Sequence, residues 1–413
     1  MPVISLLVCE GGKKGRLNGE TMKLKSFGVS VYPDIESLED ITKYLERASK
    51  FGCEYVFSSM FSVEGTKEEV LDYFKEFIKV AHNFNIKVVL DLNPPFLKKM
   101  GVDYDDVSLM HDIGCDVMRM DMPFGAEKDF VLVNNPYNIS IMFNASGSFA
   151  DELAYFEENG VPKEKVLLGH NFYPQPYTGL KWKNFLETNR ILKQYGYPVQ
   201  AFISSRNPEA TGVWDANYGL PTVERLRNLP IDTQARIIEA TGNVDMVWIG
   251  NAFATEEEME SLIEVQKDVR PIEESPVYEM FKSFGLLRRE RKDDRKIRVV
   301  LDEGITDTEQ YQLFEMFPQL DMGDSSEWIW RSRTGRMVQP DVPFRKCEKD
   351  MFEVGDVLIV NNNYQHYAGE IQIVRIPFKN DGQRNYLGHL AEGEELMLDL
   401  LKNFDEVTFL KAK

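Results

Sequence analysis

The chain of 413 residues has few of the side chains that metal sites and disulfide frameworks require. It contains four cysteines and five histidines, and no two cysteines stand in a CxxC spacing. Zinc sites and redox-active thiol pairs depend on such spacings, so the sequence predicts neither of them. We expect reduced cysteines in a cytoplasmic protein, with no metal and no cofactor.

Basic residues are also in short supply, because Lys and Arg number 48 against 67 Asp and Glu, a formal net charge of −19. Nucleic acids and anionic membranes are bound by concentrated positive charge, which argues against both as partners. No apolar run approaches the ~20 residues of a membrane span, and Pro2–Cys9 lacks the basic flank of a signal peptide. Residues 1–22 fit no element, and we predict a disordered extension there.

Residues 23–270 alternate short apolar runs with amphipathic segments that have helical periodicity. Thr66-Lys67-Glu68-Glu69 is a capping-box pattern, and glycines follow the helical segments where a C-cap belongs. Eight such units predict an α/β fold, a (β/α)8 TIM barrel. A doubly wound open sheet is the competing fold, but no GxGxxG motif follows the first run. The predicted strands are Phe27–Val31, Tyr55–Phe61, Lys87–Leu92, Val117–Met122, Ile139–Phe143, Val166–Leu168, Val199–Ile203 and Met246–Ile249.

The alternation of short apolar runs with helical segments ends after residue 270. Residues 271–295 are rich in charge and are predicted to be a linker. Residues 296–413 contain strand-like runs that glycines separate, without alternating long helices, which predicts a small, mostly-β barrel domain. Its predicted strands are Ile297–Leu301, Glu327–Trp330, Asp356–Val360, Glu370–Pro377 and Glu406–Leu410.

Ionisable side chains stand at the ends of two neighbouring strands of the predicted barrel. TIM-barrel chemistry occurs at the C-terminal strand ends, where Asp91 and Asp121 can face one pocket. Arg119 lies two residues before Asp121 and points to the same side of the strand. Two carboxyl groups flanking a bond are what glycoside hydrolysis needs, so Asp121 and Asp91 are the predicted catalytic pair. The alternative is structural: Asp121 pairs with Arg119, and Asp91 caps the turn at Asn93.

Hydrogen-bonding and aromatic residues are concentrated in His170–Leu180, HNFYPQPYTGL, directly after the sixth strand. A loop of this kind on a rigid scaffold is typical of a binding platform. The loops after strands seven and eight predict a phosphate site, and an arginine of the second domain either reaches over the barrel mouth or belongs to a solvated strand. The candidate substrate-binding residues are Asn93, Arg119, Asn144, His170, Asn171, Tyr173, Arg206, Asn251 and Arg331, and Glu64 and Asp215 are reserve carboxylates.

Several segments resemble one family, the bacterial 6-phospho-N-acetylmuramidases. They are GVSVYP at Gly28–Pro33, HNFYPQPYTGL at His170–Leu180, YGLPT at Tyr218–Thr222, GNAFAT at Gly250–Thr255, and GDSSEWIWRS and YAGEIQI in the second domain. The resemblance implies a TIM barrel followed by a cyclophilin-like β-barrel domain. It also implies a cytoplasmic glycosidase of cell-wall sugar recycling, whose substrate is N-acetylmuramic acid 6-phosphate β-1,4-linked to N-acetylglucosamine.

We therefore predict a glycoside hydrolase that cleaves this phosphorylated amino-sugar disaccharide. One alternative is a phosphoglycosidase that acts on a different 6-phospho sugar. Another is a sensor that binds the sugar phosphate without turning it over. Cleavage of the phosphorylated disaccharide separates an enzyme from a sensor.

Overall fold

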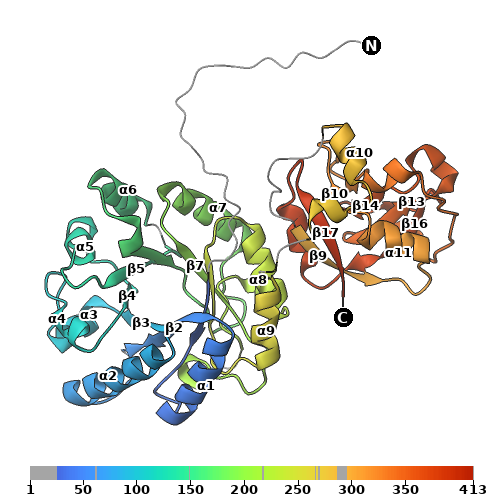
Figure 1. The fold of residues 1–413 in the computed structure, drawn as a ribbon. Coiled ribbons are helices and arrows are strands. Elements are labelled where there is room, and N and C mark those ends of the chain that lie inside the picture. The colour runs from blue at the N-terminus through green and yellow to red at the C-terminus, as the bar shows by residue number, and fades with distance from the viewer. Residues whose placement is uncertain are drawn as a thin grey trace.

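The computed structural model describes residues 26–60, 63–147, 149–215, 218–265, 267, 270–285 and 295–412. The predicted extension at residues 1–22 lies outside the described residues, as do residues 286–294 of the predicted linker. Two parts lie side by side, a barrel surrounded by helices and a smaller part built mainly of strands (Figure 1).

The first part is the predicted TIM barrel. Its eight strands form one closed parallel barrel in sequence order, and β1 pairs with both β2 and β8. The strands are β1 (Ser26–Ser30), β2 (Cys53–Ser59), β3 (Lys87–Leu92), β4 (Val117–Met120), β5 (Ser140–Asn144), β6 (Val166–Gly169), β7 (Val199–Ile203) and β8 (Met246–Ile249). The helices are α1 (Leu38–Lys50), α2 (Lys67–Asn83), α3 (Pro94–Met100), α4 (Ser108–Asp112), α5 (Ala126–Val133), α6 (Ala150–Glu158), α7 (Trp182–Leu192), α8 (Ile231–Ala240) and α9 (Glu256–Val265).

Local sequence signals explain these boundaries. Thr66 and Glu69 form the predicted capping box of α2, in which each side chain accepts from the other residue's backbone N–H. Inside the barrel, side chains from β2 to β8 pack together into a filled core, as in other TIM barrels. Gly28 makes room for one of them, because a Cβ there would lie 2.6 Å from the Trp248 ring.

The second part is a mixed, nearly closed sheet in the order β10-β17-β9-β16-β13-β14-β11. Its end strands approach each other where the Leu320 N–H donates to the Ser332 hydroxyl at 2.9 Å. The strands are β9 (Arg295–Leu301), β10 (Gln319–Leu320), β11 (Ile329–Ser332), β13 (Asp356–Val360), β14 (Ile371–Val374), β16 (Arg384–Leu390) and β17 (Glu406–Lys411), with the ribbon β12 (Met351–Phe352) and β15 (Phe378–Lys379) beside them. The helices are α10 (Tyr278–Ser283) and α11 (Asp307–Phe314). The likeness to cyclophilin stays a prediction.

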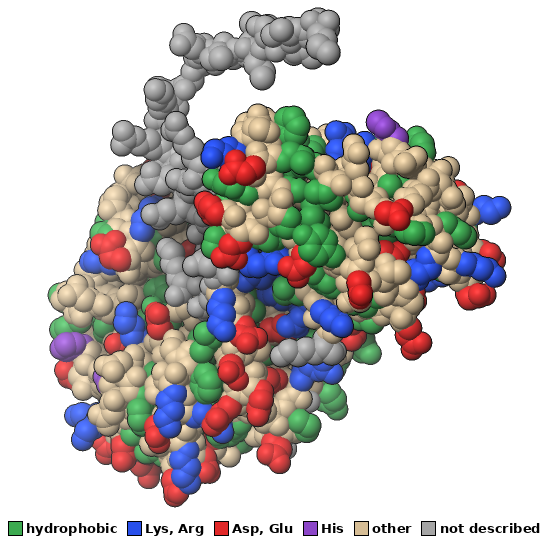
Figure 2. Space-filling model, turned by 45° about the vertical axis from the view of Figure 1, so that its right-hand side comes forward, with side chains coloured by type: hydrophobic (Ala, Val, Ile, Leu, Met, Phe, Trp, Pro, Cys, Tyr) green, Lys and Arg blue, Asp and Glu red, His purple; other side chains and the backbone are tan. Residues whose placement is uncertain are grey.

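The second part packs against the flank of the barrel formed by α8 and α9 (Figure 1). Arg236 of α8 forms a buried ion pair with Glu394 of the other part. The Lys296 ammonium donates to the backbone oxygens of Val265 and Lys267, each at 2.9 Å. On the face drawn in Figure 2, Lys and Arg side chains gather between the two parts. Polar contacts therefore hold much of this interface.

Candidate active site

A pocket of about 180 Å³ opens at the C-terminal ends of the barrel strands. Aromatic side chains form much of its wall and a few polar groups converge on it, a combination that small-molecule sites share. The polar residues that line it are Ser59, Asp91, Arg119, Asp121 and Asn171. The aromatic ones are Phe57, Phe172, Phe202 and Trp214.

Arg119 lies at the centre of the polar side of this pocket. It is the register partner of Asp91 across β3 and β4, so the two side chains emerge next to each other. Nη1 of Arg119 forms a short ion pair with the Asp91 carboxylate and lies 3.6 Å from Oδ1 of Asp121. Nη2 donates to the Asn171 side-chain oxygen. One guanidinium thus ties together two carboxylates and the loop after β6.

The two carboxylates differ in their surroundings. The Asp91 side chain is 11% exposed, whereas that of Asp121 is 40% exposed. Burial raises the pKa of Asp91, while the neighbouring Arg119 acts in the opposite direction. A buried carboxyl group beside an accessible carboxylate is an arrangement that supports acid–base chemistry at one bond.

Burial of His170 corrects one sequence prediction. The imidazole is fully buried and does not line the pocket, so it is not placed to hold sugar hydroxyls. Its Nδ1 lies 3.2 Å from the Ser146 hydroxyl and its Nε2 lies 3.1 Å from the Asn189 oxygen. Burial lowers its pKa to about 4, so the ring is neutral. Because Ser146 in turn accepts from the Asn171 N–H at 2.9 Å, His170 positions the pocket residue Asn171.

The predicted phosphate site after β7 and β8 is also corrected, because the protein's own carboxylate fills it. Glu258 accepts from the Ser205 hydroxyl at 2.6 Å and from the Arg206 N–H at 2.7 Å. It also caps its own helix by accepting from the Thr255 N–H at 3.0 Å. These donors are therefore satisfied internally, and Arg206 is exposed outside the pocket.

The other predicted binding residues either accept hydrogen bonds from backbone N–H groups or lie outside the pocket. The side chains of Asn93, Asn144 and Asn251 accept from backbone N–H groups of Phe96, Ser146 and Ser205, respectively. Tyr173 does not line the pocket, and Arg331 pairs with Glu370 and Asp324 of the second part. Of the reserve carboxylates, Glu64 is exposed, and the side chain of Asp215 lies outside the described residues. The structure therefore brings Asp91, Arg119, Asp121 and Asn171 together.

Two features of the site were missed by sequence reasoning. Trp214 lines the pocket from the long loop after β7, with 74% of its surface exposed and a φ of 55°. Arg227 donates to the backbone oxygens of Tyr173 and Gly219, each at 2.9 Å, and so joins the loops after β6 and β7. A tryptophan in a long loop was the available signal for the first, whereas nothing local marks the second.

Comparison with known families decides where the protein belongs. A model described as 6-phospho-N-acetylmuramidase, N-terminal, matches residues 27–264, and the corresponding C-terminal model matches residues 295–410. The chain belongs to the 6-phospho-N-acetylmuramidase family. The family name indicates a glycosidase, and it implies a phosphorylated sugar as the substrate.

Two solved structures match nearly the whole chain of this family member. An uncharacterized Bacillus cereus protein is 31% identical, with a TM-score of 0.74, over 94% of this chain and 100% of that one. A conserved Enterococcus faecalis protein with an unknown function is 21% identical, with a TM-score of 0.60, over 94% of this chain and 96% of that one. The second likeness supports the fold alone. No curated protein matches the chain.

The structure adds two findings on metals and membranes. Within the described residues, no group of three or more His, Cys, Asp and Glu side chains is placed to hold a metal ion. None of the helices that the structure describes is long and apolar enough to cross a membrane.

Proposed function

We propose that this protein hydrolyses the β-1,4 bond between N-acetylmuramic acid 6-phosphate and N-acetylglucosamine, in the cytoplasmic recycling of cell-wall sugars. The observation that carries the proposal is the contact of Asp91 and Asp121 with one guanidinium in the barrel pocket. Glycosidases need two carboxyl groups that flank the scissile bond. Membership of the family supplies the class of reaction and the phosphorylated sugar.

Asp121 is the carboxylate that we assign to the reacting bond, as general acid or nucleophile. It is the more exposed member of the pair, and it lines the pocket. Asp91 is the partner, whose raised pKa lets it share a proton during the reaction. Both contact Nη1 of Arg119, which favours the ~5 Å separation of retaining glycosidases over the wider gap of inverting ones.

Arg119 is the basic residue that lines the pocket, and we assign to it the phosphate or lactyl carboxylate of the substrate. Its Nε is buried and has no hydrogen-bond partner among the described residues. An arginine fork suits both anions, because it donates two parallel hydrogen bonds. Asn171 would hold a sugar hydroxyl, and the exposed ring of Trp214 would stack on a sugar face.

Product analysis tests the proposal. The protein is incubated in parallel with the 6-phosphorylated disaccharide and with its unphosphorylated counterpart, and the released sugars are identified by mass spectrometry. We expect cleavage of the phosphorylated compound and at least tenfold slower cleavage of the other, about 1.4 kcal/mol of discrimination. Cleavage of neither compound contradicts the glycosidase assignment and leaves a sensor. Equal cleavage of both contradicts recognition of the phosphate.

A further inference from the structure

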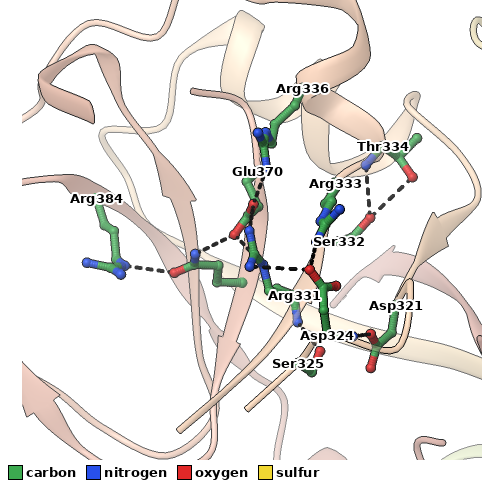
Figure 3. Close-up of polar contacts among 11 residues, drawn as sticks. Asp321, Asp324, Ser325, Arg331, Ser332, Arg333, Thr334, Arg336, Glu370 and Arg384 are labelled. Carbon is green, nitrogen blue, oxygen red and sulfur yellow. Dashed lines mark hydrogen bonds and ion pairs between the residues drawn. The ribbon is translucent and has the colours of Figure 1, made fainter. Parts of the chain in front are cut away.

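Two of the motifs that resemble the family, GDSSEWIWRS and YAGEIQI, have no part in the barrel pocket. They meet in the second part of the molecule, where Arg331 of the first motif pairs with Asp324 of the same motif and with Glu370 of the second (Figure 3). Arg333 and Arg336, which come shortly after the first motif in the chain, pair with Asp324 and Glu370, respectively. We call Asp324, Arg331, Arg333, Arg336 and Glu370 the arginine cluster.

Glu370 is the buried carboxylate that holds the arginine cluster together. Its side chain is 1% exposed. It accepts from Nε of Arg331 at 2.9 Å, and Nη2 of Arg331 forms a second, short bond to it. Nη1 of Arg336 lies 3.2 Å from the same carboxylate. Arg333 pairs with Asp324. The cluster therefore has one more cation than it has carboxylates, although the whole chain carries a net charge of −19.

An open pocket of about 800 Å³ lies next to the arginine cluster. Arg333 and Arg336 line it, with their side chains 43% and 20% exposed. The Arg336 guanidinium is fixed on two sides, because it also lies 4.2 Å from the centre of the Tyr367 ring. A cation held in this way loses little conformational entropy when a ligand binds.

Amide and imidazole side chains form the remainder of the polar wall. Gln339, Asn362, Gln365 and His366 line the pocket and can exchange hydrogen bonds with hydroxyl groups. The wall also contains one carboxylate, Asp341, which accepts from the Asn362 side chain at 2.6 Å. Arginines beside several amides are a combination that suits an anionic group on a polyhydroxylated body.

Close backbone packing fixes the shape of this pocket. A Cβ on Gly335 would overlap the backbone oxygen of Gly369, and one on Gly369, whose φ is +89°, would overlap the Pro340 ring. Only glycine allows these segments to approach so closely and to adopt that φ. The pocket wall is thus built before any ligand arrives.

We propose that this pocket is a second ligand site, which binds a small sugar that carries a phosphate or a carboxylate group. Arg333 and Arg336 hold the anion, and the amide side chains hold sugar hydroxyls. The volume is within the range of small-molecule sites, which is roughly 300–1,000 Å³. The site lies apart from the barrel pocket, whose lining residues all belong to the barrel. The proposal does not depend on the substrate of the barrel.

Hydrogen–deuterium exchange of the full chain, read by mass spectrometry, locates binding to each pocket separately. The probes are glucose 6-phosphate, glucuronate, inorganic phosphate and glucose. We expect glucose 6-phosphate or glucuronate to protect residues 334–341 and 362–368, with an apparent affinity about tenfold higher than that of inorganic phosphate or glucose. No protection of these segments by either anionic sugar overturns the proposal. Inorganic phosphate that binds as tightly as both sugars overturns the sugar part of it.

Three variants test which side chains recognise the anion. Arg333→Gln and Arg336→Gln should each weaken the protection by about tenfold. Arg190→Gln is the matched control, because Arg190 lies on α7 and pairs only with its helix neighbour Glu187 among the described residues. If Arg336→Gln fails to fold, Arg333→Gln carries the test, since its partner Asp324 is 30% exposed. Protection that survives both substitutions contradicts the proposal.

Discussion

The barrel pocket and the arginine cluster are both built from arginine–carboxylate pairs, but in opposite proportions. In the barrel, Arg119 contacts two aspartates, and one of them is substantially exposed. In the second part, Arg331 and Arg336 share the buried carboxylate of Glu370. A surplus of carboxylates can donate and accept protons, whereas a surplus of guanidinium groups can only bind. We therefore assign chemistry to the first centre and recognition to the second.

Removal of the exposed carboxylate is expected to have the largest effect. Asp121→Asn should lower kcat by about 10³-fold, because the amide can neither transfer a proton nor attack the sugar. Hydrolysis of the phosphorylated disaccharide measures the effect. Asp151→Asn is the control, since Asp151 is exposed on α6 and does not line the pocket. A rate for Asp121→Asn within tenfold of the wild-type rate would show that Asp121 takes no part in the reaction.

The choice of leaving group separates the two roles of Asp121. A dinitrophenyl leaving group needs no proton, so an Asp121→Asn enzyme that has lost only the general acid should still release it at close to the wild-type rate. Loss of a nucleophile would slow this substrate as severely as the disaccharide. If Asp121 is the general acid, Asp91→Asn should slow the dinitrophenyl substrate. If Asp121 is the nucleophile, Asp91→Asn should leave the rate with this substrate close to that of the wild type.

Loss of one arginine should destabilise the barrel centre more than the arginine cluster. Arg119→Gln leaves the buried Asp91 without its cation, and such a loss typically costs about 3 kcal/mol. Arg336→Gln leaves Glu370 still paired with Arg331, so we expect a loss of about 1 kcal/mol. Urea unfolding, with hydrogen exchange to resolve the two parts, compares the variants. Equal losses would contradict the assigned pairing.

Trp214 allows a smaller test of how the barrel pocket holds its substrate. Trp214→Ala should raise KM by about tenfold with kcat nearly unchanged, because an exposed ring contributes binding and no chemistry. Trp328→Ala is the control, since Trp328 is half exposed but lies in the second part. A fall in kcat with KM unchanged would show that Trp214 shapes the transition state.

Glu36 is a buried carboxyl group whose hydrogen bonds come from neutral donors. It accepts from the Tyr32 N–H at 2.8 Å and from the Thr211 hydroxyl at 2.5 Å, and burial raises its pKa to about 7. The folded state then binds the proton more tightly than the unfolded state, so stability falls as the pH rises from about 4.5 to 7.

A Glu36→Gln variant tests this pH dependence. Glutamine stays neutral at every pH. The melting temperature of the variant, relative to that of the wild type, should therefore rise by a few degrees between pH 4.5 and pH 8. A constant difference between Glu36→Gln and the wild type over this range would show that Glu36 is ionised throughout.

Local patterns were sufficient to predict most of the barrel. The eight predicted strands overlap β1–β8, because apolar periodicity and caps act within a few residues. The same logic located Asp91, Arg119 and Asp121, since side chains alternate along strands. In the second part, the strands β10, β12, β15 and β16 and the helices α10 and α11 were missed, because their apolar patterns are short or mixed with charge.

Contacts between distant segments could not be predicted from local patterns. His170 follows a strand end, but only the packed structure shows that its ring points to Asn189 of α7. The hydrogen-bond donors after β7 predicted a phosphate site. In the structure they donate instead to Glu258, which follows them by more than 50 residues. The arginine cluster likewise depends on the pairing of β11 with β14.

Proton NMR of the reaction with the phosphorylated disaccharide tests the central claim most directly. Wild-type protein should release N-acetylmuramic acid 6-phosphate first as the β-anomer, because the two carboxylates are close enough for a retaining or substrate-assisted mechanism. Under the same conditions Asp121→Asn should release almost none. Appearance of the α-anomer first would contradict the close pair, and equal turnover by Asp121→Asn would contradict the site itself.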